Sequence, residues 1–389
     1  MIKLKKNNWD KQKVENVCQV ISGGTPSRII PEYFGGEILW LTPTEIPKEK
    51  ISFINDSQEK ITELGLKKSS AKVLPIGTVM LTSRATIGLI GIAGKSLTTN
   101  QGFANFICDS KKISNRFLAY WLYSKIDLIK SLSAGTTFKE ISKTTLRNLE
   151  IFVPSLPEQT QIAELFQSIE TAIEQAEQQE KNLKTLQKTL SKGLVNTQPT
   201  FGNLLNKKNC TVTNFGGVAD CDVQHDKEKK DVGRFIGLEN IESENLSITT
   251  WGNIADGTTF TKRFSKGNVL FGKRRAYLKK VAVADFDGIC SGDILVLKAK
   301  EKRMLPELLP FYVSAEAFIQ HAVSTSAGSL SPRTKWKDLS TFEIAVPDLK
   351  TQEKIVEVFL QIQTTLEQIK TQILTLKNLK QKLLNEILG

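Results

Sequence analysis

The stretch Val153-Pro154-Ser155-Leu156-Pro157-Glu158-Gln159 returns 193 residues later as Val346-Pro347-Asp348-Leu349-Lys350-Thr351-Gln352. Each copy precedes a long segment without proline, and proline fits the first turn of a helix but not its interior. The similarity continues upstream, where Ser133-Ala134-Gly135 returns as Ser326-Ala327-Gly328. The chain therefore contains an internal repeat, with the order globular block, long helix, globular block, long helix.

Both long segments carry an apolar stripe whose members recur at steps of three and four residues, as in a heptad pattern. About 37 residues at 1.5 Å each predict a helix of roughly 55 Å. A single helix would expose its stripe to water, so we expect the two copies to pair antiparallel within one chain. A homodimeric coiled coil is the alternative. The residues expected at the seam are Ile162, Phe166, Ile169, Ile173, Leu183, Leu190, Ile355, Phe359, Ile362, Leu366, Ile369, Ile373, Leu376 and Leu383.

The two blocks show a mixed, strand-rich pattern in which short apolar or β-branched runs alternate with glycines. Strands are expected at 78–82, 87–93, 268–271, 281–284 and 294–297, and a helical segment ends each block, near 116–132 and 305–323. The fold class is therefore α+β, with two repeated mixed α/β domains separated by two long helices in an antiparallel intramolecular coiled coil. The expected divisions are 1–151, 152–199, 200–344 and 345–389.

Positive charge is concentrated in the two blocks. The 389 residues include 53 Lys and Arg against 41 Asp and Glu, a net charge of +12. Residues 1–151 carry 22 basic and 13 acidic side chains, and residues 200–344 carry 21 and 17. A localised basic excess suits a polyanion, most often a nucleic acid.

The composition also excludes several classes of protein. No apolar run approaches the roughly 18–20 residues of a membrane span, and the first six residues, Met-Ile-Lys-Leu-Lys-Lys, contain no signal-peptide core. Five cysteines, at positions 18, 108, 210, 221 and 290, are an odd number without Cys-x-x-Cys spacing. Neither a disulfide framework nor a zinc ribbon is expected, and we predict a reducing, cytoplasmic location without a membrane partner.

Catalytic signatures are weak. Gly94-Lys95-Ser96 has the ending of a phosphate-binding Walker loop, but Leu89 stands where that loop needs its first glycine, and no Gly-x-Gly-x-x-Gly occurs. The acidic cluster 220–230, with Asp220, Asp222, Asp226, Glu228 and Lys230, leaves open a Mg²⁺-dependent nuclease, although the first block has no counterpart. A third reading is a coiled-coil adaptor that binds acidic protein surfaces. No metal site is expected at His225 or His321.

Polar, basic and glycine-rich loops remain, at corresponding places of the two blocks. Arginine suits the O6 and N7 atoms of guanine, asparagine and glutamine suit adenine, and lysine mainly neutralises phosphate. The densest basic stretch is Lys273-Arg274-Arg275-Ala276-Tyr277-Leu278-Lys279-Lys280. The residues predicted to contact DNA are Thr25, Ser27, Arg28, Ser83, Arg84, Asn100, Gln101, Thr136, Thr137 and Lys139 in the first block, and Lys273, Arg274, Arg275, Tyr277, Lys279, Ser329, Ser331 and Arg333 in the second.

Short segments of both blocks form a recognisable set: 23–28, 40–43, 82–88 and 99–103, then 271–282, 285–288 and 290–295. In these segments, and in the repeated Val-Pro-x-Leu-x-x-Gln, the whole chain resembles the specificity subunit of type I restriction–modification systems. It departs from that family at Ala276, where a proline is common, and after Arg84, where no second arginine follows.

The resemblance implies a division of labour. The two blocks would be target recognition domains that read two different halves of a split double-stranded DNA site, held apart by the long helices. Methylation and cleavage would belong to two modification (methyltransferase) subunits and to restriction (motor-nuclease) subunits. S-adenosylmethionine, ATP and Mg²⁺ would bind to those partners, and this chain would hold no cofactor and catalyse no reaction.

Overall fold

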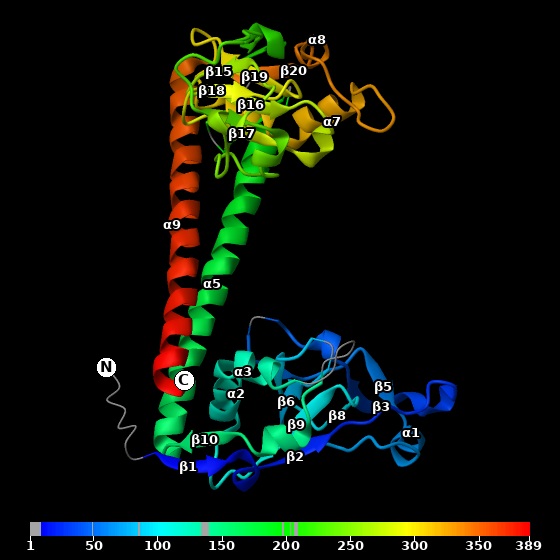
Figure 1. Cartoon of the computed structure of the whole chain (residues 1–389). Helices are drawn as coiled ribbons and strands as arrows, with labels where there is room; N and C mark the ends of the chain where they lie inside the picture. Colours follow the sequence, from blue (N-terminus) through cyan, green and yellow to red (C-terminus); the bar gives the residue numbers. More distant parts are fainter. Residues whose placement is uncertain are drawn as a thin grey trace. The chain divides into compact units, whose positions relative to one another are not determined.

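The computed structural model describes residues 9–48, 50–84, 86–133, 140–196, 198–202, 204–205 and 209–389. The chain divides into two compact units (Figure 1). Unit 1 comprises Met1–Glu177 and Thr371–Gly389, and unit 2 comprises Gln178–Lys370. Each long helix therefore contributes one end to each unit.

Unit 1 contains a five-stranded sheet in the order β2-β9-β6-β7-β4, a three-stranded sheet in the order β5-β3-β8, and the pair β1-β10. Its core packs the five-stranded sheet against α2, with Phe106 and Phe117 fully buried. The strands are β1 (Asp10–Lys13), β2 (Cys18–Ser22), β3 (Phe34–Leu41), β4 (Ser52–Ile54), β5 (Glu59–Ile61), β6 (Val79–Thr82), β7 (Ile90–Ala93), β8 (Thr98–Thr99), β9 (Phe103–Cys108) and β10 (Glu150–Val153). The short helices are α1 (Glu63–Lys67), α2 (Asn115–Ser124), α3 (Ile126–Ser131) and α4 (Lys143–Arg147).

Unit 2 contains two four-stranded sheets, in the orders β12-β19-β16-β17 and β14-β13-β18-β15, and the pair β11-β20. The strands are β11 (Cys210–Asn214), β12 (Ala219–Asp222), β13 (Arg234–Ile236), β14 (Gly252–Asn253), β15 (Lys262–Phe264), β16 (Val269–Gly272), β17 (Val281–Val283), β18 (Gly288–Cys290), β19 (Ile294–Ala299) and β20 (Glu343–Pro347). The short helices are α6 (Leu309–Val313), α7 (Glu316–Ser324) and α8 (Trp336–Leu339).

The two units share the central strand pairings of their sheets, although the sheets differ in the number of strands. In unit 1, β6 pairs antiparallel with β9 while β3 pairs parallel with β8; in unit 2, β16 pairs antiparallel with β19 while β13 pairs parallel with β18. The turns before β6 and β16 use Gly77 and Gly267 at φ +86° and +87°, a region that glycine enters without steric cost. The expected α+β repeat with two long helices is therefore confirmed.

The long helices are α5 (Leu156–Leu194) and α9 (Leu349–Leu388). The repeated glutamine of the opening motif explains how each helix is fixed to its unit. Buried Gln159 accepts from the Ser114 amide (2.7 Å) and donates to the carbonyls of Lys112 and Pro154. Gln352 repeats this pattern in unit 2, because it accepts from the Leu305 amide (2.9 Å) and donates to two carbonyls.

The ends of the helices pack antiparallel within each unit. In unit 1, Ile162 and Phe166 of α5 share a buried cluster with Leu384 and Ile387 of α9. In unit 2, Leu194 of α5 shares a cluster with residues of α9 that include Ile355 and Phe359. Of the expected seam residues, Leu183, Leu190, Ile373, Leu376 and Leu383 are half-buried, and the structure buries Ile162, Phe166, Ile169, Ile173, Ile355, Phe359, Ile362, Leu366 and Ile369.

The unit 1 helix pair also contains a buried ion pair. Lys380 of α9 lies 2.6 Å from Glu170 of α5, and the Tyr120 hydroxyl donates to the same carboxylate at 2.8 Å. Burial, with the neighbouring Glu170 charge, raises the pKa of the Tyr120 phenol well above its usual value. Within the part of the chain that the structure describes, no helix has the length and apolar character needed to cross a bilayer.

Candidate nucleic-acid interface

In unit 1, three segments meet at the end of β6. The Ser83 amide donates to the Gly102 carbonyl (2.7 Å), and the Ile141 amide donates to the Ser83 carbonyl (3.1 Å). The Asn100 side chain closes the turn before β9 by accepting from the Gly102 amide at 2.9 Å. We call this meeting point the unit 1 corner, comprising residues 83–84, 100–102 and 140–141.

The side chains of the unit 1 corner divide between the interior and the surface. Ser83 is fully buried, and its hydroxyl donates to the Gly102 carbonyl at 3.2 Å. Its predicted contact with DNA therefore does not fit its position in the fold, because a small polar group bonded inside the core is not presented to a ligand. Arg84 is exposed at the surface and forms an ion pair with Glu140 at 2.9 Å.

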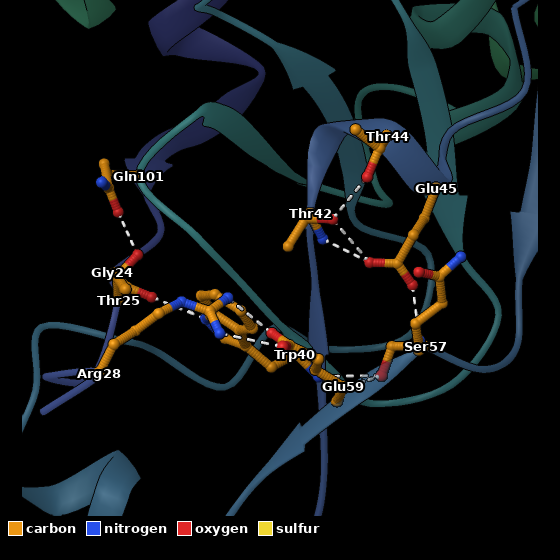
Figure 2. Close-up of polar contacts among 11 residues, drawn as sticks. Gly24, Thr25, Arg28, Trp40, Thr42, Thr44, Glu45, Ser57, Glu59 and Gln101 are labelled. Carbon is orange, nitrogen blue, oxygen red and sulfur yellow. Dashed lines mark hydrogen bonds and ion pairs between the residues drawn. The ribbon is translucent and has the colours of Figure 1, made fainter. Parts of the chain in front are cut away.

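The loop that contains Thr25 and Arg28 joins the same region. The Gly24 amide donates to the Thr99 carbonyl (2.8 Å), while the indole of buried Trp40 donates to the Gly24 carbonyl (2.9 Å). A Cβ on Gly23 would lie 2.2 Å from the Asn100 carbonyl oxygen, so glycine is required there. The Thr25 hydroxyl bonds to the Gln101 side chain (Figure 2). The structure thus brings Thr25, Arg28, Asn100 and Gln101 to one region.

Arg28 has a fixed partner, Glu59. Its guanidinium donates two hydrogen bonds to the Glu59 carboxylate, at 2.9 and 2.7 Å (Figure 2). It also lies 5.2 Å from the ring centroids of Phe34 and Trp40. These bonds hold the pKa of Glu59 below its usual range and raise that of Arg28. Ser27, next to it, is exposed.

The sheet beside this pair is held by a second carboxylate. Glu45 accepts from the Thr42 amide (2.8 Å) and from the Gln58 amide (2.7 Å), which ties the end of β3 to the segment before β5 (Figure 2). Neither Glu45 nor Glu59 was expected from the sequence to be part of this region. Residues 40–43, one of the short segments in which the chain resembles the specificity-subunit family, lie here. The buried tryptophan of this segment therefore supports the loop that carries Thr25.

Unit 2 repeats the corner with the same main-chain bonds. The Lys273 amide donates to the Asp293 carbonyl (2.9 Å), and the Thr334 amide donates to the Lys273 carbonyl (3.1 Å). The Ser291 hydroxyl accepts from the Asp293 amide at 3.2 Å, in the place of the Asn100 turn. We call residues 273–275, 291–293 and 333–334 the unit 2 corner.

Different side chains occupy this second corner. The Asp293 carboxylate forms ion pairs with two guanidinium groups, because Arg333 lies 2.7 Å and Arg274 lies 3.5 Å from its oxygens. The hydrogen bond from Arg333 is the main reason that the pKa of Asp293 lies below its usual range. Asp293 is a central residue that the sequence did not single out.

Residues 327–333 form a tight hairpin that the corner holds in place. Ala327 and Arg333 exchange two main-chain hydrogen bonds, at 3.0 and 2.9 Å, and Gly328 turns the chain at φ +108°. Arg274 donates to the Ser331 hydroxyl (3.1 Å), and Arg275 donates to the Leu330 carbonyl (3.2 Å). The structure therefore brings Lys273, Arg274, Arg275, Ser329, Ser331 and Arg333 together.

The remaining predicted residues are less concentrated. Arg275 and Lys279 both adopt positive φ, +53° and +52°, on either side of a single helical turn that presents exposed Tyr277. Lys279 pairs with Glu316 (2.7 Å) and Glu244 (3.5 Å), and the bond to Glu316 raises its pKa. Thr136, Thr137 and Lys139 lie outside the described residues.

The acidic cluster that left a nuclease open does not gather into a site. Asp220 pairs with Lys300 (3.2 Å), Asp226 with Arg263 (2.7 Å) and Glu228 with Lys230 (2.7 Å). Among the residues that the structure describes, no group of three His, Cys, Asp or Glu side chains is arranged to hold a metal ion.

Comparison with known proteins agrees with these features. The chain is 38% identical over 181 residues to the type I restriction enzyme MjaIX specificity subunit of Methanocaldococcus jannaschii, a match that spans 46% of this chain and 42% of that relative's length. It is 25% identical over 316 residues to the EcoDI specificity subunit of Escherichia coli, covering 72% of this chain and 70% of that one.

A solved structure shares the fold over nearly the full length. The S subunit of a type I restriction–modification system from M. genitalium superposes with a TM-score of 0.59 at 15% sequence identity, covering 98% of this chain and 97% of that one. The family model described as the type I restriction modification DNA specificity domain matches twice, at residues 6–185 and 211–378. The chain therefore belongs to the type I restriction–modification DNA specificity family.

Proposed function

We propose that this chain reads DNA sequence for a type I restriction–modification complex, with unit 1 and unit 2 each recognising one half of an asymmetric, bipartite site. The observation that carries the proposal is the pair of corners, which repeat one main-chain arrangement but present different side chains. A symmetric dimer presents two identical surfaces and reads a palindrome. Two divergent surfaces in one chain suit two different half-sites.

The chemistry of the corners supports recognition of DNA. Arginine guanidinium groups held by carboxylates have a fixed orientation, as bidentate contact with a guanine edge requires. In this proposal the chain performs no catalysis and holds no cofactor. It brings two modification subunits, which methylate, and restriction subunits, which cleave, to the site, while S-adenosylmethionine, ATP and Mg²⁺ bind to those partners.

An exchange of domains tests whether the two units read independently. Replacing residues 1–151 by the corresponding block of a relative should change one half of the recognised site and leave the other half intact. The site is measured by mapping methylated adenines in cells that carry either the parent or the exchanged chain. A change in both halves, or in neither, would contradict independent reading.

We also propose that the paired helices set the gap between the half-sites. Four residues inserted after Gln178 add about 6 Å of helix, close to two base pairs at about 3.4 Å each. Because four residues are near one helical turn, the apolar stripe stays approximately in register. The preferred gap should lengthen by one or two base pairs with both half-sites unchanged, and an unchanged gap would mean that other subunits position the domains.

A further inference from the structure

The tip of the unit 2 hairpin presents an apolar side chain. Leu330 is 87% exposed, and among the large hydrophobic side chains that the structure describes only Ile29 is more exposed, at 91%. A single exposed leucine is ordinary on a protein surface. Leu330 differs because the surrounding chain holds it in one place.

Two sets of hydrogen bonds fix the main chain at Leu330. Main-chain bonds between Ala327 and Arg333 close the base of the hairpin, and the Arg275 guanidinium donates directly to the Leu330 carbonyl at 3.2 Å. Arg274 holds the next residue, Ser331, at 3.1 Å. These bonds reduce the conformational freedom that the tip would otherwise lose on binding a ligand.

The surroundings of Leu330 are strongly basic. The hairpin and the unit 2 corner contain the basic residues Lys273, Arg274, Arg275 and Arg333 and one carboxylate, Asp293. A basic surface with an apolar centre complements DNA, where phosphates flank the apolar faces of the bases and the thymine methyl groups. Proteins that bend DNA insert leucine or isoleucine between base steps in such surroundings.

We propose that Leu330 is a specificity-determining residue of unit 2, which makes apolar contact with the bases of its half-site while the surrounding arginines bind phosphates and base edges. The inference rests on the proposed reading of DNA and assigns a role to a residue outside the basic and polar set. This apolar contact takes one of two forms: contact with a thymine methyl group, or insertion of the leucine between two stacked base pairs.

The test uses the full chain and a pool of duplexes with randomised positions. Wild-type protein first selects its preferred duplex, and binding is then compared for wild type, Leu330→Ala and the matched control Val223→Ala, another exposed hydrophobic residue of unit 2 at 71%. Leu330→Ala should bind the selected duplex about 5- to 10-fold more weakly, the size of a modest single-position loss. Its binding to a random duplex and its salt dependence should not change, and Val223→Ala should match wild type on both.

Two further measurements separate the forms of contact. If Leu330 touches a thymine methyl group, replacing that thymine by deoxyuridine weakens DNA binding by the wild-type protein but not by Leu330→Ala. If Leu330 enters a base step, the fluorescence of 2-aminopurine placed at that step increases when the wild-type protein binds but not when Leu330→Ala binds. Either result supports the proposal.

Equal binding of Leu330→Ala and wild type to the selected duplex would overturn the inference and leave the proposed function standing. Equal weakening on selected and random duplexes would also overturn it, because the leucine would then act only through the shape of the hairpin. Failure of wild type to select any sequence would overturn the proposed function itself.

Discussion

The two corners have the same main chain and different charges. In unit 1, Arg84 and Glu140 form a one-to-one pair; in unit 2, Asp293 is shared by Arg274 and Arg333, and Arg275 adds a third guanidinium nearby. In both corners the strand end, the turn and the returning segment are joined through main-chain atoms. The difference teaches that the repeat conserves the support of the surface while the surface itself diverges.

The helix pair shows a second difference between the units. The buried Lys380–Glu170 pair belongs to unit 1. At the positions 193 residues away, Gln187 and Gln363 occupy unit 2, and both are half-buried. A buried ion pair in only one of two similar seams distinguishes the two ends of the helix pair, in the way that single buried polar residues fix the register of coiled coils.

The largest expected effect breaks this ion pair. Glu170→Ala leaves Lys380 buried without its carboxylate, and such a loss costs about 3–5 kcal/mol of unfolding free energy. The matched unit 2 change, Gln363→Ala, should cost less than about 1 kcal/mol, since no buried charge is left. Urea unfolding followed by circular dichroism measures both. The double variant Glu170→Gln with Lys380→Gln should recover most of the loss, and similar costs for both single variants would show that the seams do not differ.

The next effect compares the arginines of the corners. Arg274→Ala with Arg275→Ala should weaken DNA binding and lower its salt dependence, at about 0.9 of slope for each phosphate contact removed. If one of them reads a guanine, about 1–3 kcal/mol is lost at a single base pair. Arg84→Ala, which removes one guanidinium from unit 1, should lower the slope less. Titrations at several salt concentrations give the slopes, and an unchanged slope in the folded double variant would remove these arginines from the interface.

A smaller effect follows from the acidic partners. Asp293→Asn releases two guanidinium groups and removes a negative charge that repels phosphate. Binding to random DNA should strengthen about two- to fivefold, or roughly 0.4–1 kcal/mol, while discrimination between selected and random duplexes falls. Glu140→Gln releases only one guanidinium and should do less. Competition assays measure binding to random DNA by both variants. Equal strengthening by Asp293→Asn and Glu140→Gln, or weaker binding by either, would argue against the carboxylates as orienting partners.

The smallest effect concerns pH. The pKa of Asp293 is lowered from its ordinary 3.8 by the Arg333 bond, so the pair contributes stability that is present above that value and is lost as pH falls through the lowered one. The stability difference between wild type and Asp293→Asn should therefore stay constant from pH 8 to pH 5 and shrink only below about pH 4. The Arg28–Glu59 pair of unit 1 follows the same sign, because the pKa of Glu59 is also lowered. Thermal unfolding across this pH range is the check, and a difference that shrinks between pH 7 and pH 5 would contradict it.

Periodicity made the long helices and the repeat predictable, because both depend on residues close together in sequence. Boundaries inside the blocks were less accurate. The expected strand at 87–93 begins at Ile90, since Gly88 turns at φ +105°. The helical segment expected at 116–132 is divided into α2 and α3 at Lys125. Local patterns do not record such turns when apolar residues continue through them.

The sequence singled out the arginines of the candidate site but not the carboxylates that pair with them. Arg28 meets Glu59 31 residues later, and Arg333 meets Asp293 40 residues earlier. Only the fold brings such residues together, so no local motif marks them. Ser83 shows a second limit of the local pattern, since it was singled out as a DNA contact beside an arginine and its hydroxyl is bonded inside the core.

The main-chain bonds of the corners have a consequence for how such a protein changes over generations. The amides and carbonyls at positions 83, 102 and 141, and at 273, 293 and 334, hold these segments together whatever side chains stand there. Substitutions at Arg84, Glu140, Arg274 or Arg333 therefore alter the chemistry offered to a ligand at little cost to folding. In the proposed reading of DNA, a lineage that carries this scaffold would have many viable single steps from one target to another, without first rebuilding the domain.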